Sequence, residues 1–183
     1  MTPFTLIPFP GEKTDGLAIE GSLVRSPASL RFSMCVSGGQ DALARLAGIS
    51  LPPARRPERR DRLWTSTCFE LFWGIAGEEG YWEFNLSPVG HWNVYALDGY
   101  RRGMRREERI SGLVTGSEAS FGHYRIWAEL DLSGLSLGNA PLSAGLSAIL
   151  DHGEGRLSYW ALVHPGEQPD FHRREAFAIG LGG

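Results

Sequence analysis

The segment from Tyr81 to Leu97, YWEFNLSPVGHWNVYAL, alternates apolar and polar side chains on either side of one short turn. Before the turn, Trp82, Phe84 and Leu86 share one side, and the mainly polar residues between them share the other. Strict alternation with a period of two residues is typical of antiparallel strands that bury one face. The segment therefore predicts a β-hairpin with an apolar face and a polar face.

The turn of this hairpin decides which residues face each other. If residues 88–90 form a three-residue loop with Gly90 in the left-handed region, Asn85 faces Asn93 and Glu83 faces Tyr95. A two-residue loop would slip the register by one residue and mix the two faces. We therefore expect the three-residue loop, and we interpret the shared polar face as a candidate binding surface.

A third strand, expected over residues 67–73, extends the polar face with Glu70. Its connection to the hairpin is centred near Gly77, which places Glu70 close to Glu83, and directly opposed side chains lie about 5 Å apart. Two carboxylates at that separation need a counter-charge, a metal, a shared proton or a ligand. The alternative is that both face water or pair with an arginine such as Arg101.

Short strand-like segments recur along the rest of the chain, separated by breaks rich in glycine, of which there are 24. Many short strands at such spacing indicate an all-β fold, an antiparallel β-sandwich of jelly-roll type, as a single domain over residues 1–183. Residues 40–47 read as one short helix. Further strands are expected at 5–7, 17–25, 30–36, 110–115, 124–131, 146–151, 158–164 and 175–181.

Composition excludes several kinds of partner. The net charge of −3 gives no general attraction to nucleic acid or to anionic membranes, and no apolar run is long enough to span a bilayer. Ten arginines fall in two runs, at 55–62 and 101–109, which we interpret as solvated loops; the alternative is that they border the site and bias it towards anions. With no basic, apolar leader at the N-terminus and only Cys35 and Cys68, we expect a cytoplasmic protein with reduced cysteines.

The second informative segment, residues 157–172, is a strand that runs into a loop containing two prolines. Pro165 and Pro169 stiffen this loop and position Asp170, Phe171 and His172, so the loop is a candidate part of the site. The alternative is that Asp170 caps a turn and His172 bonds to the backbone, which is common in loops.

Four motifs together resemble the DOMON-like sandwich proteins related to family 9 carbohydrate-binding modules. They cover about a third of the chain: LWTSTCFELF (63–72), YWEFNLSPVGHWNVYAL (81–97), YRRGM (100–104) and SYWALVHPGEQPDFH (158–172). The resemblance implies a β-sandwich that binds a small ligand, a sugar or haem, on one face or at strand ends. Secreted sugar-binding relatives normally carry an export signal, which we do not expect here, and haem-binding relatives need axial ligands, which we cannot assign in this sequence.

The leading hypothesis is a non-catalytic module that binds a carbohydrate or a sugar derivative, because the predicted face mixes aromatic rings with planar amide, carboxylate and guanidinium groups. Trp64 and Trp160 are the expected platforms, and Trp73, Trp82, Trp92 and Trp127 are expected in the core. The expected ligand-binding residues are Trp64, Glu70, Glu83, Asn85, Asn93, Tyr95, Tyr100, Arg101, Trp160, His164, Asp170 and His172.

Three other functions stay open at this point. Glu70 and Glu83 at about 5 Å would suit a retaining glycoside hydrolase. A haem-binding domain is the next alternative, and a metal site on Glu70, Glu83 and His91 is the last. The sequence assigns no cofactor and no oligomeric state.

Overall fold

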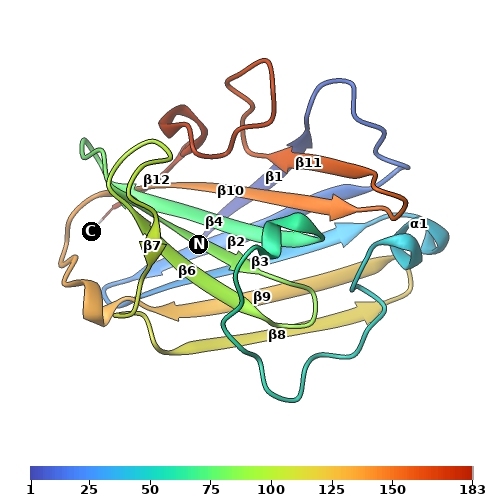
Figure 1. The fold of residues 1–183 in the computed structure, drawn as a ribbon, viewed down its shortest axis with the longest axis horizontal. Coiled ribbons are helices and arrows are strands. Elements are labelled where there is room, and N and C mark those ends of the chain that lie inside the picture. The colour runs from blue at the N-terminus through green and yellow to red at the C-terminus, as the bar shows by residue number, and fades with distance from the viewer. Residues whose placement is uncertain (183) are drawn as a thin grey trace.

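A computed structural model describes residues 1–182 as antiparallel strands, three 3₁₀ turns and one short helix, α1 (Gln40–Arg45). All strands belong to one curled sheet in the order β7-β6-β5-β4-β10-β11-β1-β2-β3-β9-β8, with β12 paired to β10 (Figure 1). The all-β fold expected from the sequence is confirmed. Within the described residues, no helix is long and apolar enough to cross a membrane.

The sheet curls because β1 (Thr2–Pro8) belongs to both of its halves. Residues 2–6 pair with β2, whereas Ile7 and Pro8 pair with β11. One half, here called the β9 layer, contains β1, β2 (Ala18–Ser26), β3 (Ser29–Ser37), β8 (Leu113–Ser120) and β9 (His123–Asp131). The other, the β4 layer, contains β4 (Cys68–Ile75), β5 (Tyr81–Leu86), β6 (Trp92–Leu97), β7 (Arg105–Arg106), β10 (Leu142–Asp151), β11 (Leu157–Ala161) and β12 (Ile179–Leu181).

The two layers pack face to face around the main hydrophobic core. Phe32 of β3 meets Phe84 of β5 edge-on, and Tyr124 of β9 stacks on Phe69 of β4. In Figure 1, β8 and β9 run along the bottom and β10 and β11 along the top. This arrangement is a β-sandwich, with its core where the alternating apolar residues of both layers meet.

The two layers differ in what lies on their outer faces. Strands β3 and β9 alternate between buried and more exposed residues, as expected for a sheet with one solvated side. Strands β4 and β6 are buried at nearly every position. The outer face of the β4 layer is therefore covered as well, and the polar residues predicted on it do not form an open surface.

The register predicted for the 81–97 hairpin is confirmed. Asn85 pairs with Asn93 and Glu83 with Tyr95, and Gly90 has a φ of 93°. The turn closes through the Gly90 N–H, which donates to the carbonyl oxygen of Ser87. The sequence pattern thus determined both the loop length and the positive φ.

Gly90→Val is expected to lower the free energy of unfolding by about 1–2 kcal/mol, because a β-branched residue at positive φ is strained. A Cβ at this position would meet Pro57 at 3.6 Å, an ordinary contact, so the cost comes from the backbone conformation. Urea denaturation measures the change, with Val89→Ala in the same turn as control. Equal stability of the Gly90→Val variant and the native protein would contradict the argument.

Several expected boundaries were wrong. The strand expected at 110–115 begins at Leu113, because the chain is irregular at Ser111 and Gly112. The strand expected at 158–164 ends at Ala161, where the chain leaves the sheet as a loop. The segment expected at 175–181 forms a 3₁₀ turn, η3 (Arg174–Ala176), followed by the short strand β12. The other 3₁₀ turns are η1 (Leu63–Thr65) and η2 (Ser133–Leu135).

Candidate functional site

Three loops cover the outer face of the β4 layer and form a second, smaller core with it. They are the segment containing η1, the β6–β7 connection at 98–104 and the segment at 162–178, which stands above β10 and β11 in Figure 1. The buried residues of this second core are Phe72, Tyr81, Tyr95, Leu97, Ile149, Ala161, Phe171, Ala176 and Phe177. The loops thus enclose the polar residues of β4 and β5 within an aromatic surround.

A pocket of about 300 Å³ remains between the strands and these loops. Its walls are mainly apolar, with a few polar groups among them, as is usual for small-ligand sites. The lining residues are Trp64, Glu70, Glu83, Leu97, Arg101, Met104, Ile149, Tyr159, Pro169, Phe171 and His172. Five of the twelve residues expected in the site line this pocket: Trp64, Glu70, Glu83, Arg101 and His172.

The two carboxyl groups of the pocket are diagonal neighbours on adjacent strands. Glu70 pairs with Asn85, and Glu83 pairs with Phe72. The sequence predicted that Glu70 and Glu83 pair directly, and this register was wrong by two residues. Diagonal positions lie about 7–8 Å apart between Cα atoms, still within reach of long side chains. The expected separation of about 5 Å therefore does not apply.

Both carboxyl groups are buried, with Glu70 2% and Glu83 3% exposed. Ser147 donates its hydroxyl hydrogen to Glu70 Oε2 at 2.9 Å, and Asn85 Nδ2 donates to Glu83 Oε1 at 2.7 Å. The second oxygen of Glu83, Oε2, is buried and accepts no hydrogen bond. A buried acceptor without a donor is costly, and here it lies on a side chain that lines a pocket.

Burial raises the pKa of Glu70, and the negative charge of Glu83 raises it further. Burial also raises the pKa of Glu83, against the opposing effect of its hydrogen bond from Asn85. Arg101, which the sequence offered as a counter-charge, forms its ion pair with Asp170 instead, at 2.9 Å. The pocket therefore holds two carboxyl groups that favour the protonated state more than exposed glutamates do.

His172 presents a neutral ring to this pair. Tyr81 Oη accepts a hydrogen bond from the backbone N–H of Arg101, so its own hydrogen is free to bond to His172 Nδ1 at 2.8 Å. That leaves the proton of the ring on Nε2, which lies 3.9 Å from Glu83 Oε2. Burial, followed by the charge of Arg101, lowers the pKa of His172 to about 4. The imidazole is therefore a neutral donor at physiological pH.

Asp170 ties the 162–178 loop to the β6–β7 connection. Its carboxylate accepts hydrogen bonds from Tyr100 Oη at 2.5 Å, from Arg101 at 2.9 Å and from the backbone N–H of His172 at 3.2 Å. It also lies 3.4 Å from Arg173 Nε. These contacts hold the 162–178 loop in place. The hydrogen bond from the His172 backbone is also the turn cap by Asp170 that was the alternative interpretation.

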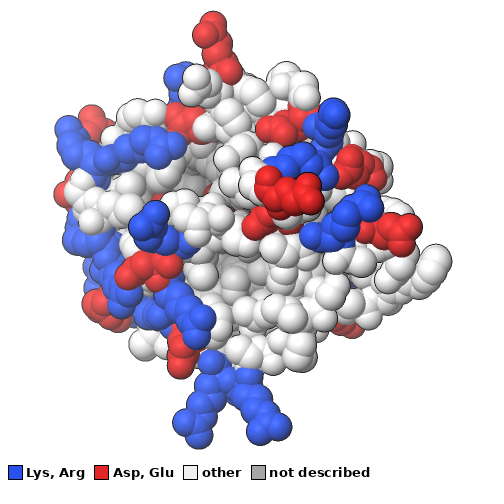
Figure 2. Space-filling view, turned by 45° about the vertical axis from the view of Figure 1, so that its right-hand side comes forward, with Lys and Arg blue, Asp and Glu red and all other residues white. Residues whose placement is uncertain are grey.

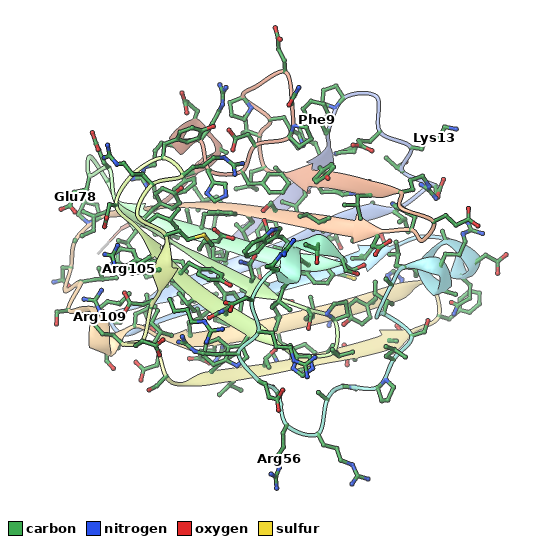
Figure 3. The ribbon with its side chains drawn as sticks, in the orientation of Figure 1. Phe9, Lys13, Arg56, Glu78, Arg105 and Arg109 are labelled. Carbon is green, nitrogen blue, oxygen red and sulfur yellow. The ribbon has the colours of Figure 1, made fainter. Side chains whose placement is uncertain are left out.

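Four of the expected site residues lie outside the pocket lining but close to it. Asn85 donates a hydrogen bond to Glu83. Asp170, with its hydrogen bonds from Tyr100, Arg101 and the His172 backbone, is here called the latch, and it lies at the rim of the pocket. His164 bonds to the carbonyl oxygen of Ile7 and packs on Phe9, which Figure 3 shows beside the loop after β11. His164 therefore supports the loop from behind and does not reach the rim.

Asn93 and Tyr95 serve a different contact. Both donate to Asp61 Oδ1, each at 2.8 Å, and Arg106 pairs with the same carboxylate. The polar face of the hairpin is thus divided, because the loop carrying Asp61 covers its β6 half. The expectation that Asn93 and Tyr95 line one open, concave face with the glutamates was wrong.

Two tryptophan predictions were also wrong. Trp160 is 2% exposed and belongs to the main core, where its Nε1–H donates to Ser158. Its neighbour Tyr159 points to the opposite side and lines the pocket. Trp127, expected in the core, lies half-buried on the outer face of the β9 layer against Gly116. Successive side chains of a strand point to opposite faces, so in each case the tryptophan was assigned to the wrong face of its strand.

Several residues that line the pocket were not among those expected from the sequence: Leu97, Met104, Ile149, Tyr159, Pro169 and Phe171. Phe171 stands inside the PDFH motif, between two residues that were singled out. It packs against Tyr159 and His164. The prolines were expected to position Phe171 together with its neighbours, but Phe171 was not among the expected ligand-binding residues.

The metal site on Glu70, Glu83 and His91, the last of the alternatives, is not assembled. His91 lies at the hairpin turn, where its Nδ1 accepts a hydrogen bond from the backbone N–H of Glu58. Across residues 1–182, the structure groups no three His, Cys, Asp or Glu side chains in a way that could hold a metal ion.

Several arginines of the two runs pair with acidic side chains. Arg102 pairs with Glu79, Arg105 with Asp98, and Arg109 with Glu107. On the face shown in Figure 2, basic and acidic side chains stand close together around a hollowed, mostly uncharged middle. This pairing agrees with the interpretation of the runs as surface loops.

Comparison with known proteins adds a fold relationship. No protein-family model and no curated protein matches the chain. A crystal structure of a Bacteroides uniformis protein, for which carbohydrate binding has been suggested, is similar over 96% of this chain and 84% of its own, with a TM-score of 0.66 and 14% identity. A family 9 carbohydrate-binding module from Caldicellulosiruptor kristjanssonii, in complex with cellotriose, is similar over 87% of this chain and 71% of its own (TM-score 0.49, 9% identity). The first of these likenesses shows a shared β-sandwich fold.

Proposed function

We propose that this chain binds a small carbohydrate, of one or two sugar rings, in the pocket on the outer face of the β4 layer. The observation that carries the proposal is the pairing of aromatic walls with a buried carboxylate oxygen that lacks a donor. The suggested carbohydrate binding of the Bacteroides uniformis protein, which shares the fold, supports the same class of ligand. The relation to DOMON-like proteins is part of this proposal.

The apolar walls suit the C–H faces of a sugar ring. Trp64, Tyr159 and Phe171 come from three different segments and surround the same space. Aromatic rings contribute apolar area while losing little side-chain entropy. A volume of about 300 Å³ lies at the lower end of ligand pockets, which favours a small ligand over a polymer.

The polar groups suit hydroxyls. Glu83 Oε2 is an acceptor without a donor, and His172 Nε2–H is a donor without a close acceptor. A sugar hydroxyl between them would satisfy both, because it donates and accepts at the same time. Arg101, fixed by Asp170, adds donors at the rim.

The geometry favours binding over glycoside hydrolysis. Retaining enzymes use two carboxyl groups that flank the scissile bond, one on each side of it. Inverting enzymes also place the two carboxyl groups on opposite sides of the sugar. Glu70 and Glu83 both project from one face of one sheet.

Trp64→Ala is expected to weaken the binding of the disaccharide cellobiose by at least about tenfold, because removing a ring from the wall forfeits about 1.5–3 kcal/mol of apolar contact. Isothermal titration calorimetry measures the change. Trp127→Ala is the matched control, since Trp127 is a half-buried tryptophan on the outer face of the other layer.

Equal loss in the two tryptophan variants, or none in Trp64→Ala, would contradict the proposed location. Failure of cellobiose, D-glucose and D-glucosamine all to bind the native protein would contradict the proposed function. A Soret absorption band in the purified protein would instead support the haem alternative.

A further inference from the structure

We propose that the ligand carries a protonated amino group, and hence is an amino sugar, whose ammonium lies between Glu70 and Glu83. This inference rests on the proposed function and names the class of sugar. It starts from two carboxyl groups that share a pocket, one of which keeps a buried oxygen without a partner. Throughout residues 1–182, neither of them forms an ion pair with a lysine or arginine.

In residues 1–182 no lysine or arginine lies within ion-pair distance of this pair, although the charge of Arg101 acts on both carboxyl groups and lowers their pKa. Arg101, the basic residue of the pocket, is held at the rim by Asp170 and by the φ of 50° at its own backbone. Lys13 is the single lysine, and Figure 3 shows it on the loop after β1, at the opposite end of the molecule from Glu78 and Arg105. His172 faces Glu83 but remains neutral at physiological pH. A cation in direct contact with both carboxyl groups would therefore come from the ligand.

An ammonium group fits the acceptors that are present. It offers three N–H donors and no acceptor, which matches carboxylate oxygens on two adjacent strands. Two ionised carboxylates buried together repel each other. A cation between them attracts both, and this attraction offsets the repulsion. A hydroxyl group can donate only one hydrogen, so it would leave the pair dependent on a retained proton.

Binding of an ammonium should also release protons. Burial raises the pKa of both glutamates, and the charge of Glu83 raises that of Glu70 further, whereas a cation would favour the ionised forms. The other titratable or charged groups facing the pair are Arg101 and His172 from the loops, Tyr81 from β5 and Cys68 from β4. Burial raises the pKa of Tyr81 and of Cys68, so neither ionises at neutral pH and the released protons come from the glutamates.

Isothermal titration calorimetry with D-glucosamine, D-glucose and N-acetyl-D-glucosamine tests the inference at pH 6.5, where a primary amine is protonated. D-Glucosamine is expected to bind at least about tenfold more tightly than D-glucose, because hydrogen bonds between charged groups are the stronger ones. N-Acetyl-D-glucosamine, which lacks the charge, should show no such gain. Repeating the titration in buffers of different ionisation enthalpy detects the released protons.

Glu83→Gln keeps the shape of the side chain and should reduce the preference for D-glucosamine to less than about threefold, with Glu70→Gln acting in the same direction. Glu78→Gln, at an exposed glutamate outside the pocket, should leave the preference unchanged. Circular dichroism verifies that each variant is folded.

The outcomes separate the two proposals. Tighter binding of D-glucosamine that depends on Glu83 supports the amino-sugar inference. Equal affinity for D-glucosamine and D-glucose overturns this inference and leaves carbohydrate binding in place. A preference for D-glucosamine that survives both glutamine substitutions also overturns it, because the charge would then be recognised elsewhere. Absence of binding by any sugar tested overturns both.

Discussion

Glu70→Gln is expected to raise the free energy of unfolding at pH 8 by on the order of 2 kcal/mol, and to change it little at pH 5. In the folded chain, burial and the charge of Glu83 raise the pKa of Glu70 above its usual value of 4.5. The stability that protonated Glu70 contributes is therefore fully present below pH 4.5, the pKa of a glutamate in the unfolded chain. It is lost as the pH rises through the higher pKa of Glu70 in the folded chain. Glutamine removes the proton equilibrium while still accepting the hydrogen bond from Ser147.

Urea denaturation of the variant and the native protein at both pH values measures this difference. His172, whose pKa is lowered to about 4, gives a slope of opposite sign on the acid side, but it acts on both proteins and cancels between them. Glu78→Gln, at an exposed glutamate, is the control and should show no change with pH. An equal gain at pH 5 and pH 8, or a loss at pH 8, would contradict the assignment of a protonated, buried Glu70.

Asp170→Ala is expected to lower the free energy of unfolding by about 1–3 kcal/mol and to release the 162–178 loop from the pocket. The variant loses hydrogen bonds from Tyr100, Arg101 and the His172 backbone at once, and Arg101 and His172 both line the pocket. Hydrogen exchange should therefore accelerate in residues 165–177. Sugar affinity should fall with it, because the aromatic and imidazole walls lose their fixed positions.

The matched control is Asp98→Ala, which breaks an exposed ion pair with Arg105 next to the same connection. It should have almost no effect, since exposed ion pairs contribute little. Equal hydrogen-exchange rates of residues 165–177 in the Asp170→Ala and Asp98→Ala variants would contradict the claim that Asp170 holds the loop.

The sequence determined the local geometry of the hairpin but not its surroundings. Alternation in YWEFNLSPVGHWNVYAL was enough to predict the register, because a three-residue loop leaves one pairing that keeps both faces intact. Alternation states which side chains share a face and says nothing about what covers that face. The loop carrying Asp61 and the segment after β11 are distant in sequence, so the burial of Glu70, Asn85 and Asn93 could not be read from the strands.

Two further errors have definite physical sources. The longer β4–β5 connection does not restrict the register as the 88–90 turn does, which is why Glu70 was assigned to the wrong partner. In β11, Tyr159 and Trp160 are both aromatic, so the pattern permitted either to face outward, and the main core takes the larger ring. Glu70, Glu83, Arg101 and His172, all among the expected ligand-binding residues, nevertheless line one pocket although they come from four separate segments.

The most direct test of the central claim is a nuclear magnetic resonance titration that follows the indole N–H signals of the six tryptophans. Variants lacking Trp64 or Trp127 assign their two signals, and cellobiose and D-glucosamine are then added to the native protein. The proposed site predicts that the Trp64 signal shifts with sugar concentration while the Trp127 signal, from the outer face of the β9 layer, stays in place. A shift confined to Trp127, with Trp64 unmoved, would contradict a binding site on the outer face of the β4 layer.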